Sequence, residues 1–392
     1  MRVAVLFDTY LNDRKGLFNA IVNRTKCLMA MPECAVEMIC LQGRPAGLNR
    51  LIRRSPRKHY DETFQADGLT FRVVWYKRFF LDDVLFNRFR LPPFLFRRWV
   101  RRVSGQFKEY DIITAHSARC GETARQVNKY HGTPFFVTWH GTDIHTTPFQ
   151  SKELKKYISN ILASATCNFF VSKALSEIAL GFAQGFRYEI LYNGVADQFK
   201  EYDKQTRKAL RDKYGVGTNK VVAFAGNVIS VKNVLLLPYI FNEVRKLYPG
   251  ALSFWIIGDG NQRKTVEDSM KEQNVACAFW GNMDPTVMPD MMNCIDVLVL
   301  PSKNESFGLV LVEAMACGAN AVGSRVGGIP EVIGEENAFD LNDNFVTNIS
   351  KRIFFFLSHD IRQMVDKRFD WKETAKLEYS IYKQTCQDNL ER

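Results

Sequence analysis

Two glutamates with seven residues between them, Glu305 and Glu313, lie in the segment 301–318, Pro-Ser-Lys-Asn-Glu-Ser-Phe-Gly-Leu-Val-Leu-Val-Glu-Ala-Met-Ala-Cys-Gly. The apolar run before this segment predicts a strand that ends at Leu300, and the good helix formers from Leu309 to Ala316 predict a buried helix. Glu305 is therefore expected in the loop, and Glu313 about two turns farther along on the helix. Both carboxylates can accept hydrogen bonds from hydroxyl groups of a ligand.

The start of this helix offers a site for an anion. The backbone N–H groups of Phe307, Gly308 and Leu309, preceded by Ser306, are expected to lack helical partners, and the helix dipole adds positive charge there. A nucleotide-activated sugar carries hydroxyls on both sides of its phosphates and therefore suits two carboxylates that flank an anion site. Glutamates at this spacing also occur on solvated helices. The preceding strand end, the apolar helix and the later run Gly327–Glu331 favour ligand binding.

This segment resembles the donor-binding signature of the large retaining glycosyltransferase family 4. The resemblance implies that Glu305 contacts the donor sugar and that Glu313 contacts the ribose. It also implies an α/β architecture of the GT-B type, with two Rossmann-like doubly wound domains facing each other across a cleft. Further segments extend the resemblance over nearly the whole chain: Phe170–Leu175, Ile190–Val195, Phe224–Val228 with Lys232 and Asn233, and Trp255–Gly260.

The chain departs from the family pattern at two places. The family usually carries an arginine after the glycine of the 224–228 segment, paired with a lysine five residues on to clamp the diphosphate. Here Asn227 replaces the arginine while Lys232 is kept. A glycine pair commonly follows the first strand near the acceptor, whereas this chain has Asn-Asp-Arg-Lys-Gly at 12–16. Gly16 is the residue that we place on the acceptor side.

His140 is the third candidate for catalysis, with Glu305 and Lys232. The run Thr138–Asp143, Thr-Trp-His-Gly-Thr-Asp, resembles the family's "HG-x-D" segment, which implies a place beside the donor sugar at the mouth of the cleft. The alternative is a structural histidine. No residue suggests a covalent nucleophile. The resemblance implies retention of configuration, with attack on the face that the diphosphate leaves and transfer of the acceptor's proton to its oxygen.

The expected ligand is a UDP- or GDP-sugar, without a further cofactor. No Asp-x-Asp triplet occurs in the sequence, so a divalent metal is not expected. The Gly258-x-Gly260 pattern lacks a third glycine, which disfavours an NAD site. The nine cysteines form no Cys-x-x-Cys pair, which argues against a disulfide framework or a structural zinc site.

The length of 392 residues and 46% hydrophobic content predict two domains. Alternating strand and helix patterns predict parallel sheets. We expect an acceptor-side domain over 1–196, a linker over 197–219, a donor-binding domain over 220–370, and a helix over 371–392 that packs back on the first domain. The expected strands are 3–7, 36–40, 71–75, 111–115, 134–138 and 168–171 in the first domain, and 221–225, 252–257, 276–280 and 297–300 in the second.

The net positive charge of the chain arises entirely from its first quarter. Residues 1–110 hold 21 Lys and Arg against 10 Asp and Glu, whereas residues 111–392 hold 32 of each. Much of this charge lies in two basic segments, 53–58 and 88–102, and the second also carries aromatic residues. Such a composition suits contact with an anionic membrane. A solvated basic face is an equal alternative. Nucleic acid is not expected, since no other feature indicates such a module.

No apolar run reaches the length of a membrane span, and residues 1–7 read as a strand and not as a signal peptide. The expected location is the cytoplasm, at the inner face of the cell membrane. The expected activity is transfer of a sugar to a hydroxyl of a glycan or lipid-linked glycan in cell-surface polysaccharide or glycolipid synthesis. Two alternatives are a sugar-nucleotide epimerase or phosphorylase on the same fold, and a non-catalytic lipid- or nucleic-acid-binding protein.

Overall fold

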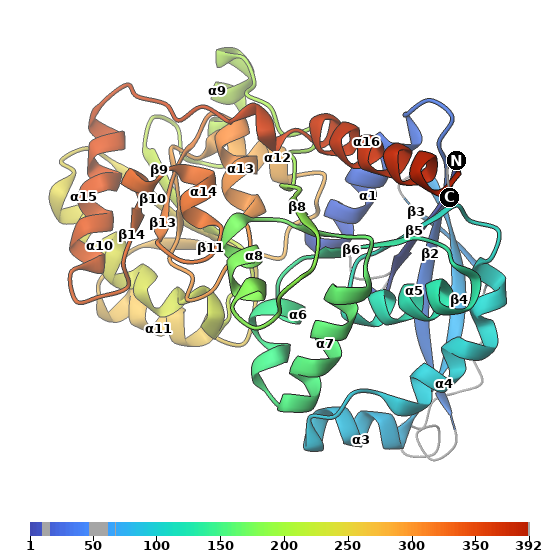
Figure 1. Cartoon of the computed structure of the whole chain (residues 1–392). Helices are drawn as coiled ribbons and strands as arrows, with labels where there is room; N and C mark the ends of the chain where they lie inside the picture. Colours follow the sequence, from blue (N-terminus) through green and yellow to red (C-terminus); the bar gives the residue numbers. More distant parts are fainter. Residues whose placement is uncertain (10–15, 47–61, 67, 391–392) are drawn as a thin grey trace. The chain divides into compact units, whose positions relative to one another are not determined.

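The structure, a computed structural model, describes residues 1–9, 16–46, 62–66 and 68–390 (Figure 1). It divides into two compact units. Unit 1 comprises Met1–Asn193 and Trp371–Arg392, and unit 2 comprises Gly194–Asp370. The expected basic segment 53–58 and residues 12–15 lie outside the described residues.

Unit 1 is built on an eight-stranded sheet in the order β3-β4-β2-β1-β5-β6-β7-β8. Neighbouring strands are parallel, except for the antiparallel pair β3 and β4. The six strands expected from the sequence are all present. The two additional ones, β3 and β8, are short strands at the sheet edges. The strands are β1 (Arg2–Phe7), β2 (Ala35–Ala46), β3 (Thr63–Ala66), β4 (Leu69–Phe79), β5 (Ile112–Ala115), β6 (Phe135–Trp139), β7 (Cys167–Phe170) and β8 (Tyr188–Ile190).

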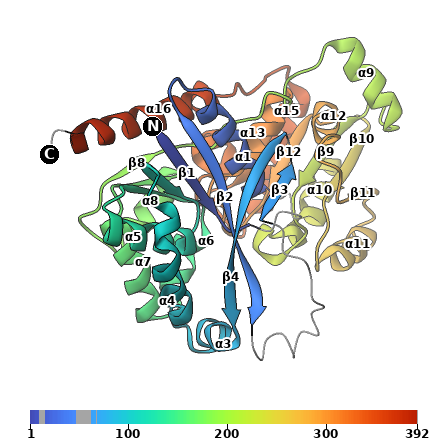
Figure 2. The ribbon, with the colours of Figure 1, turned by 90° about the vertical axis from the view of Figure 1, so that its right-hand side faces the viewer.

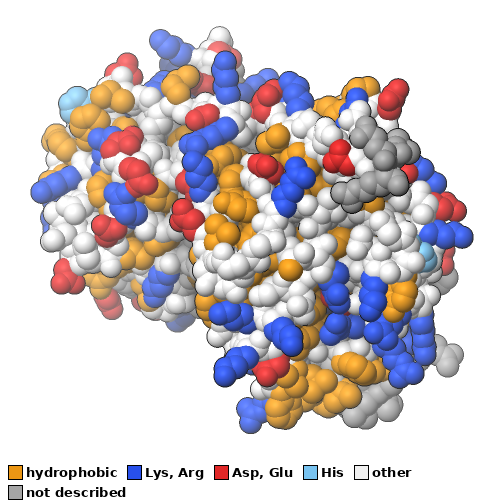
Figure 3. Space-filling view, in the orientation of Figure 1, with side chains coloured by type: hydrophobic (Ala, Val, Ile, Leu, Met, Phe, Trp, Pro, Cys, Tyr) orange, Lys and Arg blue, Asp and Glu red, His pale blue; other side chains and the backbone are white. Residues whose placement is uncertain are grey.

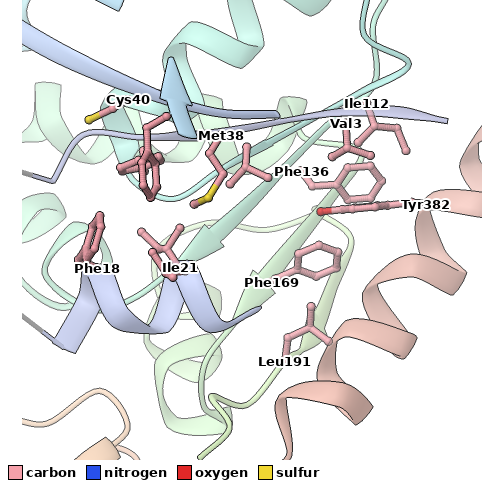
Figure 4. Packing of buried hydrophobic residues seen from close by; sticks show 14 of the residues in the cluster. Val3, Phe18, Ile21, Met38, Cys40, Ile112, Phe136, Phe169, Leu191 and Tyr382 are labelled. Atoms are coloured by element: carbon pink, nitrogen blue, oxygen red, sulfur yellow. The ribbon is translucent and has the colours of Figure 1, made fainter. Parts of the chain in front are cut away.

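Helices cover both faces of this sheet (Figures 1 and 2). Phe18 of α1 and Tyr382 of α16 belong to the same buried cluster as Phe136 of β6 (Figure 4). On the opposite face, a Cβ added to Gly121 of α5 would lie 3.3 Å from Val137 of β6. The helices are α1 (Gly16–Met29), α3 (Phe80–Phe89), α4 (Phe94–Val103), α5 (Ala118–His131), α6 (Thr142–His145), α7 (Lys152–Ser164), α8 (Lys173–Leu180) and α16 (Trp371–Leu390), with the 3-10 turns η1 (Ser104–Phe107) and η2 (Thr147–Phe149).

A buried ion pair joins α16 to α1. Arg24 Nε donates to Glu378 Oε2 at 2.5 Å, and the two side chains are 3% and 0% exposed. Arg24 Nη1 also donates to Thr138 Oγ1 of β6 at 3.1 Å, while Tyr382 Oη donates to the second oxygen of Glu378. The C-terminal helix is therefore part of the core of unit 1.

Unit 2 contains a six-stranded parallel sheet in the order β11-β10-β9-β12-β13-β14. The four expected strands are present, and β13 and β14 are additional. The strands are β9 (Lys220–Ala225), β10 (Leu252–Ile257), β11 (Cys277–Gly281), β12 (Val297–Leu300), β13 (Asn320–Ser324) and β14 (Ala338–Phe339). The helices are α9 (Lys204–Lys213), α10 (Leu237–Leu247), α11 (Arg263–Glu272), α12 (Met288–Cys294), α13 (Leu309–Ala316), α14 (Ile329–Ile333) and α15 (Phe345–Ser358), with the 3-10 turns η3 (Ser230–Lys232), η4 (Val234–Leu236), η5 (Glu335–Asn337) and η6 (Lys367–Phe369).

The segment 197–219 differs from the linker that we expected. It belongs to unit 2, where α9 packs on α12. Arg211 Nη1 donates to the carbonyl of Cys294 at 2.8 Å and lies 3.3 Å from Asp296. The polar sequence is explained by these ion pairs and hydrogen bonds, which attach an otherwise solvated helix to the unit. The chain instead passes between the units at 193–194 and at 370–371.

Within the described part of the chain, no helix combines the length and the apolar character that crossing a bilayer requires. The nine cysteines are all free thiols, and five of them are buried.

Glu378→Ala is expected to lower the free energy of unfolding by about 3 to 5 kcal/mol, because it leaves the Arg24 charge buried without its partner. Urea unfolding followed by circular dichroism measures this loss. Glu373→Ala provides the matched control on the same helix, since Glu373 is 54% exposed and pairs with Lys376 one turn away. Equal stability of the two variants would contradict the role of the buried pair.

Candidate active site

Glycines allow the chain segments after β9 and β10 to pack against each other at the carboxyl edge of the unit 2 sheet. Gly226 follows β9 with φ +145°, and Gly258 follows β10 with φ +124°. A Cβ on Gly258 would lie 2.0 Å from the carbonyl oxygen of Gly226, and a Cβ on Gly260 would lie 2.3 Å from that of Val228. Any side chain at these two glycines would push the segments apart. Their backbones are joined directly, since Val228 N donates to Asp259 O at 2.9 Å.

The loop after β12, residues 301–308, is fixed on two sides. Lys303 N donates to Val231 O at 2.8 Å, which ties the loop to η3, and Gly328 N donates to Glu305 O at 3.0 Å. A Cβ on Gly327 would lie 1.7 Å from the same Glu305 oxygen. Glycine is therefore required at position 327, and the backbone N–H of Gly328 helps to hold the Glu305 backbone in place.

Lys232 and Glu305 form an ion pair at this edge, with Nζ donating to Oε2. The two side chains are only 21% and 16% exposed, so solvent screens their attraction less than in a surface pair. Lys232 ends η3, and the left-handed backbone of Asn233, φ +54°, turns the chain immediately after it. The residues assigned to the donor sugar and to the diphosphate therefore meet at one point.

Helix α13 begins beside this pair, with the bounds that the sequence predicts. Gly308 precedes it with φ +90°, and Leu309 is its first residue. Phe307 is buried and its ring contacts Phe369 at 5.5 Å, while Ser306 is half-buried. The glycine lets the chain enter the helix directly from the Glu305 loop.

Glu313 lies on α13 as a half-buried side chain. Burial raises the pKa of its carboxyl group to about 8 from the usual 4.5. Among the described residues, the structure records no hydrogen bond or ion pair to this carboxyl group. Without a ligand the group is therefore mainly neutral at pH 7 and has hydrogen-bonding capacity in reserve.

Asn227 is exposed in the segment after β9. Its carbonyl oxygen accepts a hydrogen bond from Ile229 N at 3.0 Å. For its side-chain amide, no partner is recorded within the described residues. The turn is therefore closed by the backbone alone, and the amide is free to meet a ligand.

His140 follows β6 in unit 1, where it contacts a second histidine. His116, which follows the neighbouring strand β5, places Nδ1 3.0 Å from His140 Nε2, and the rings stack with centroids 5.3 Å apart. Burial, and to a lesser extent the positive charge of Arg24, lowers the pKa of His140 to about 3. The imidazole is therefore neutral and suited to hydrogen bonding.

We did not single out His116 from the sequence. A signal was present, because His116 and His140 each come just after an expected strand, 111–115 and 134–138 respectively. Asp143 of the same motif accepts a hydrogen bond from Ala118 N of α5 at 2.9 Å, and burial raises its pKa to about 6. It therefore holds the His140 turn against the start of α5.

Gly16 is the exposed first residue of α1, and a Cβ added there would meet no atom within 4 Å. The structure shows no steric need for glycine at this position. Gly16 and His140 belong to unit 1, whereas Glu305, Glu313, Lys232, Asn227 and the 306–309 segment belong to unit 2. Among the described residues, no group of three His, Cys, Asp or Glu side chains is arranged to hold a metal ion.

Two family models match consecutive parts of the chain. The model described as Glycosyltransferase Family 4 matches residues 49–199, and that described as Glycosyl transferases group 1 matches residues 206–378. The chain belongs to glycosyltransferase family 4. In this family 4 glycosyltransferase, the match to group 1 includes Lys232, Glu305 and Glu313, all of which lie in unit 2.

Two relatives with informative names match about two thirds of the chain. N-acetyl-alpha-D-glucosaminyl L-malate synthase of Bacillus anthracis is 28% identical over 283 residues, which cover 69% of this chain and 72% of the relative. The putative teichuronic acid biosynthesis glycosyltransferase TuaC of Bacillus subtilis is 24% identical over 283 residues, covering 69% and 70%.

Solved structures confirm the GT-B fold. Anabaena HepE in complex with UDP and glucose superimposes with a TM-score of 0.67 at 16% identity, covering 100% of both chains. Sucrose-phosphate synthase from Thermosynechococcus elongatus reaches a TM-score of 0.73 at 16% identity, covering 98% of both chains.

Glu313→Gln is expected to stabilise the protein relative to wild type as the pH rises. Between pH 4.5 and about 8, the unfolded wild type loses the Glu313 proton while the folded protein keeps it, so stability falls with pH. The amide does not titrate, and the variant should gain about 1 to 2 kcal/mol by pH 8, since part of the side chain stays in water. Urea unfolding across this pH range measures the gain. The exposed Glu272→Gln is the control, and a constant difference between Glu313→Gln and wild type would contradict a raised pKa.

Proposed function

We propose that this family 4 enzyme transfers a sugar from a UDP- or GDP-sugar to a hydroxyl of a glycan or lipid-linked glycan, with retention of configuration. The observation that carries the proposal is the Lys232–Glu305 ion pair beside the start of α13. It places one cation, one carboxylate and a helix N-terminus within a single loop system, as a sugar diphosphate requires. HepE structures that hold UDP and UDP-glucose support a uridine donor as the first to test.

Each donor-side group has one role in this proposal. Glu305 orients the sugar through its hydroxyls, and Glu313 binds the ribose. Lys232, the N–H groups at 307–309 and the amide of Asn227 face the diphosphate. Because these donors are in place before reaction, they stabilise charge on the leaving group without reorganisation.

The transfer itself exchanges one bond to the anomeric carbon for another. The bond from this carbon to the diphosphate oxygen breaks while the acceptor oxygen bonds to the same face of the sugar. The proton of the acceptor hydroxyl passes to the departing phosphate oxygen. Because its pKa is lowered to about 3, the His140 imidazole is too weak a base to take this proton. We assign it a hydrogen bond to the donor sugar.

The acceptor class is supported by the relatives' names. TuaC is named for teichuronic acid biosynthesis, and a lipopolysaccharide 1,2-N-acetylglucosaminetransferase of Salmonella typhimurium is 26% identical over 196 residues. A thermal-shift screen of sugar nucleotides, followed by turnover with candidate glycans, tests the proposal. Release of nucleotide diphosphate only when an acceptor is present would exclude the epimerase alternative. Absence of any shift by sugar nucleotides would contradict donor binding.

Glu305→Gln is expected to fold normally and to lose about 1.5 to 3 kcal/mol of transition-state stabilisation, because a charge-assisted bond to the donor is weakened. Lys232→Ala should lower turnover about 100- to 1000-fold by removing a diphosphate partner. Since each change leaves the other charge unpaired, the losses should not add. The loss of transition-state stabilisation in the double variant should be about 0.5 to 3 kcal/mol smaller than the sum of the two single losses.

The exposed pair Lys246 and Glu243, with nitrogen and oxygen 3.2 Å apart, is the matched control for this cycle. Lys246→Ala and Glu243→Gln should leave turnover unchanged. Wild-type turnover by Glu305→Gln would remove Glu305 from the site. Wild-type turnover by Lys232→Ala would show that the phosphates bind elsewhere.

Asn227→Arg is expected to tighten nucleoside diphosphate binding, since it adds a guanidinium beside the phosphates. Slower release of the product should then limit turnover. Calorimetric affinity for UDP and GDP, together with steady-state turnover, measures both effects. The neighbouring exposed Ser230→Arg serves as a control for unspecific charge. Equal affinities of Asn227→Arg and wild type would place the Asn227 side chain outside the phosphate site.

A further inference from the structure

The α3–α4 surface of unit 1 exposes four large apolar side chains. Phe80 and Leu81 at the start of α3 are 42% and 55% exposed, Phe89 at its end is 61% exposed, and Phe94 at the start of α4 is 63% exposed. Figure 3 shows hydrophobic side chains gathered where Figure 1 places α3, with Lys and Arg side chains beside them over α4. Contiguous apolar surface of this kind on a folded domain marks an interaction site.

This exposure does not result from a poorly attached segment. Phe96 and Val100 of α4 are buried against Tyr76 of β4. Asp82 of α3 is buried and accepts hydrogen bonds from the backbone N–H groups of Leu95 and Phe96 at 3.0 and 2.8 Å, so α3 caps the start of α4. The inner faces of both helices are therefore occupied, and the outer faces are held in a defined position.

Arg97 is also part of this attachment. Its Nε donates to the buried Glu122 of α5 at 2.8 Å. It therefore does not belong to the free basic face that the sequence suggested for residues 88–102.

The exposed charges on these helices have a single sign. Phe94, Arg98, Arg101 and Arg102 recur at i, i+4, i+7 and i+8, and so they share one face of α4. Asn87, Arg88 and Arg90 are the other exposed polar residues of the segment 80–103. Its two acids are both engaged, since Asp82 caps α4 and Asp83 lies 2.7 Å from Arg78.

We propose that the α3–α4 surface docks on an anionic lipid bilayer. Phe80, Leu81, Phe89 and Phe94 would enter the headgroup region, while the arginines face lipid phosphates. A solvated basic helix would not expose these four apolar side chains beside its arginines. Aromatic rings beside arginines also stack on the bases of single-stranded nucleic acid, so RNA binding is one of the outcomes of the test.

Docking is separate from the proposed donor chemistry. Every residue of the α3–α4 surface lies in unit 1, whereas the residues proposed to bind the donor lie in unit 2, except for His140. It would hold the enzyme at a surface where lipid-linked acceptors are located. Binding can therefore be tested without measuring transfer.

The experiment is flotation of the full chain with vesicles of phosphatidylcholine alone or mixed with phosphatidylglycerol, at low and high salt. Wild type should float only with the anionic vesicles. Arg98→Gln, Arg101→Gln and Arg102→Gln together should weaken binding about 100-fold at low salt, at about fivefold for each charge. Phe89→Ser with Phe94→Ser keeps all the charges and should weaken binding roughly tenfold, because two rings no longer enter the bilayer.

Two matched controls separate this surface from general charge and hydrophobicity. Lys204→Gln, Lys208→Gln and Lys213→Gln remove three exposed charges of α9. Leu341→Ser with Leu377→Ser replaces two leucines that are 39% and 44% exposed. Both control variants should float as wild type does. Circular dichroism and the thermal shift with UDP verify that each variant is folded.

Several results would overturn the proposal. They are failure of wild type to float with anionic vesicles, equal flotation with neutral vesicles, and wild-type flotation by either α3–α4 variant. Loss of binding in a control variant would place the contact elsewhere. Binding to RNA or to an acidic protein without binding to vesicles would assign the surface to that class of partner.

Discussion

The parallel direction of the strands is the constraint on which the site depends. Because neighbouring strands run the same way, their carboxyl ends lie at one edge of each sheet, and the loops that follow them meet there. In unit 2, this edge collects the turns at Gly226 and Gly258 and the loop that holds Glu305. In unit 1, the same rule places His116 beside His140, although 24 positions separate them in the chain. Neither the grouping of these loops in unit 2 nor the His116–His140 contact requires a local sequence pattern of its own.

Much of this arrangement could be predicted from the sequence, because its main signals are local. The bounds of α13 follow from an apolar run between two glycines, and the central strands follow from continuous buried residues. The strand β13 was missed since its sequence, Asn-Ala-Val-Gly-Ser, consists mainly of small residues with weak strand preference. The linker was misjudged because the polar surface of α9 was taken for a solvated connection, and only the structure shows its bonds to Cys294 and Asp296.

The electrostatic state of the site was not predictable in the same way. A pKa depends on burial and on neighbours distant in the chain, so the sequence places Glu313 and His140 but not their charge. Both groups prove neutral near pH 7 for the same physical reason, the loss of water around the charged form. Lys232 and Glu305, by contrast, form an ion pair with each other. The site therefore holds its charges close to one point, where a diphosphate would compete with Glu305 for the lysine.

The participation of α16 in unit 1 has a consequence for synthesis of the chain. Tyr382 lies in the same buried cluster as Val3 and Phe18, and Arg24 is paired with the buried Glu378. All of unit 2 is translated between these partners. On the ribosome, the second half of the protein can therefore complete its core before the first half can. Until residues 371–390 emerge, the nascent first half lacks the counter-charge of Arg24 and leaves an apolar face uncovered, which exposes it to aggregation.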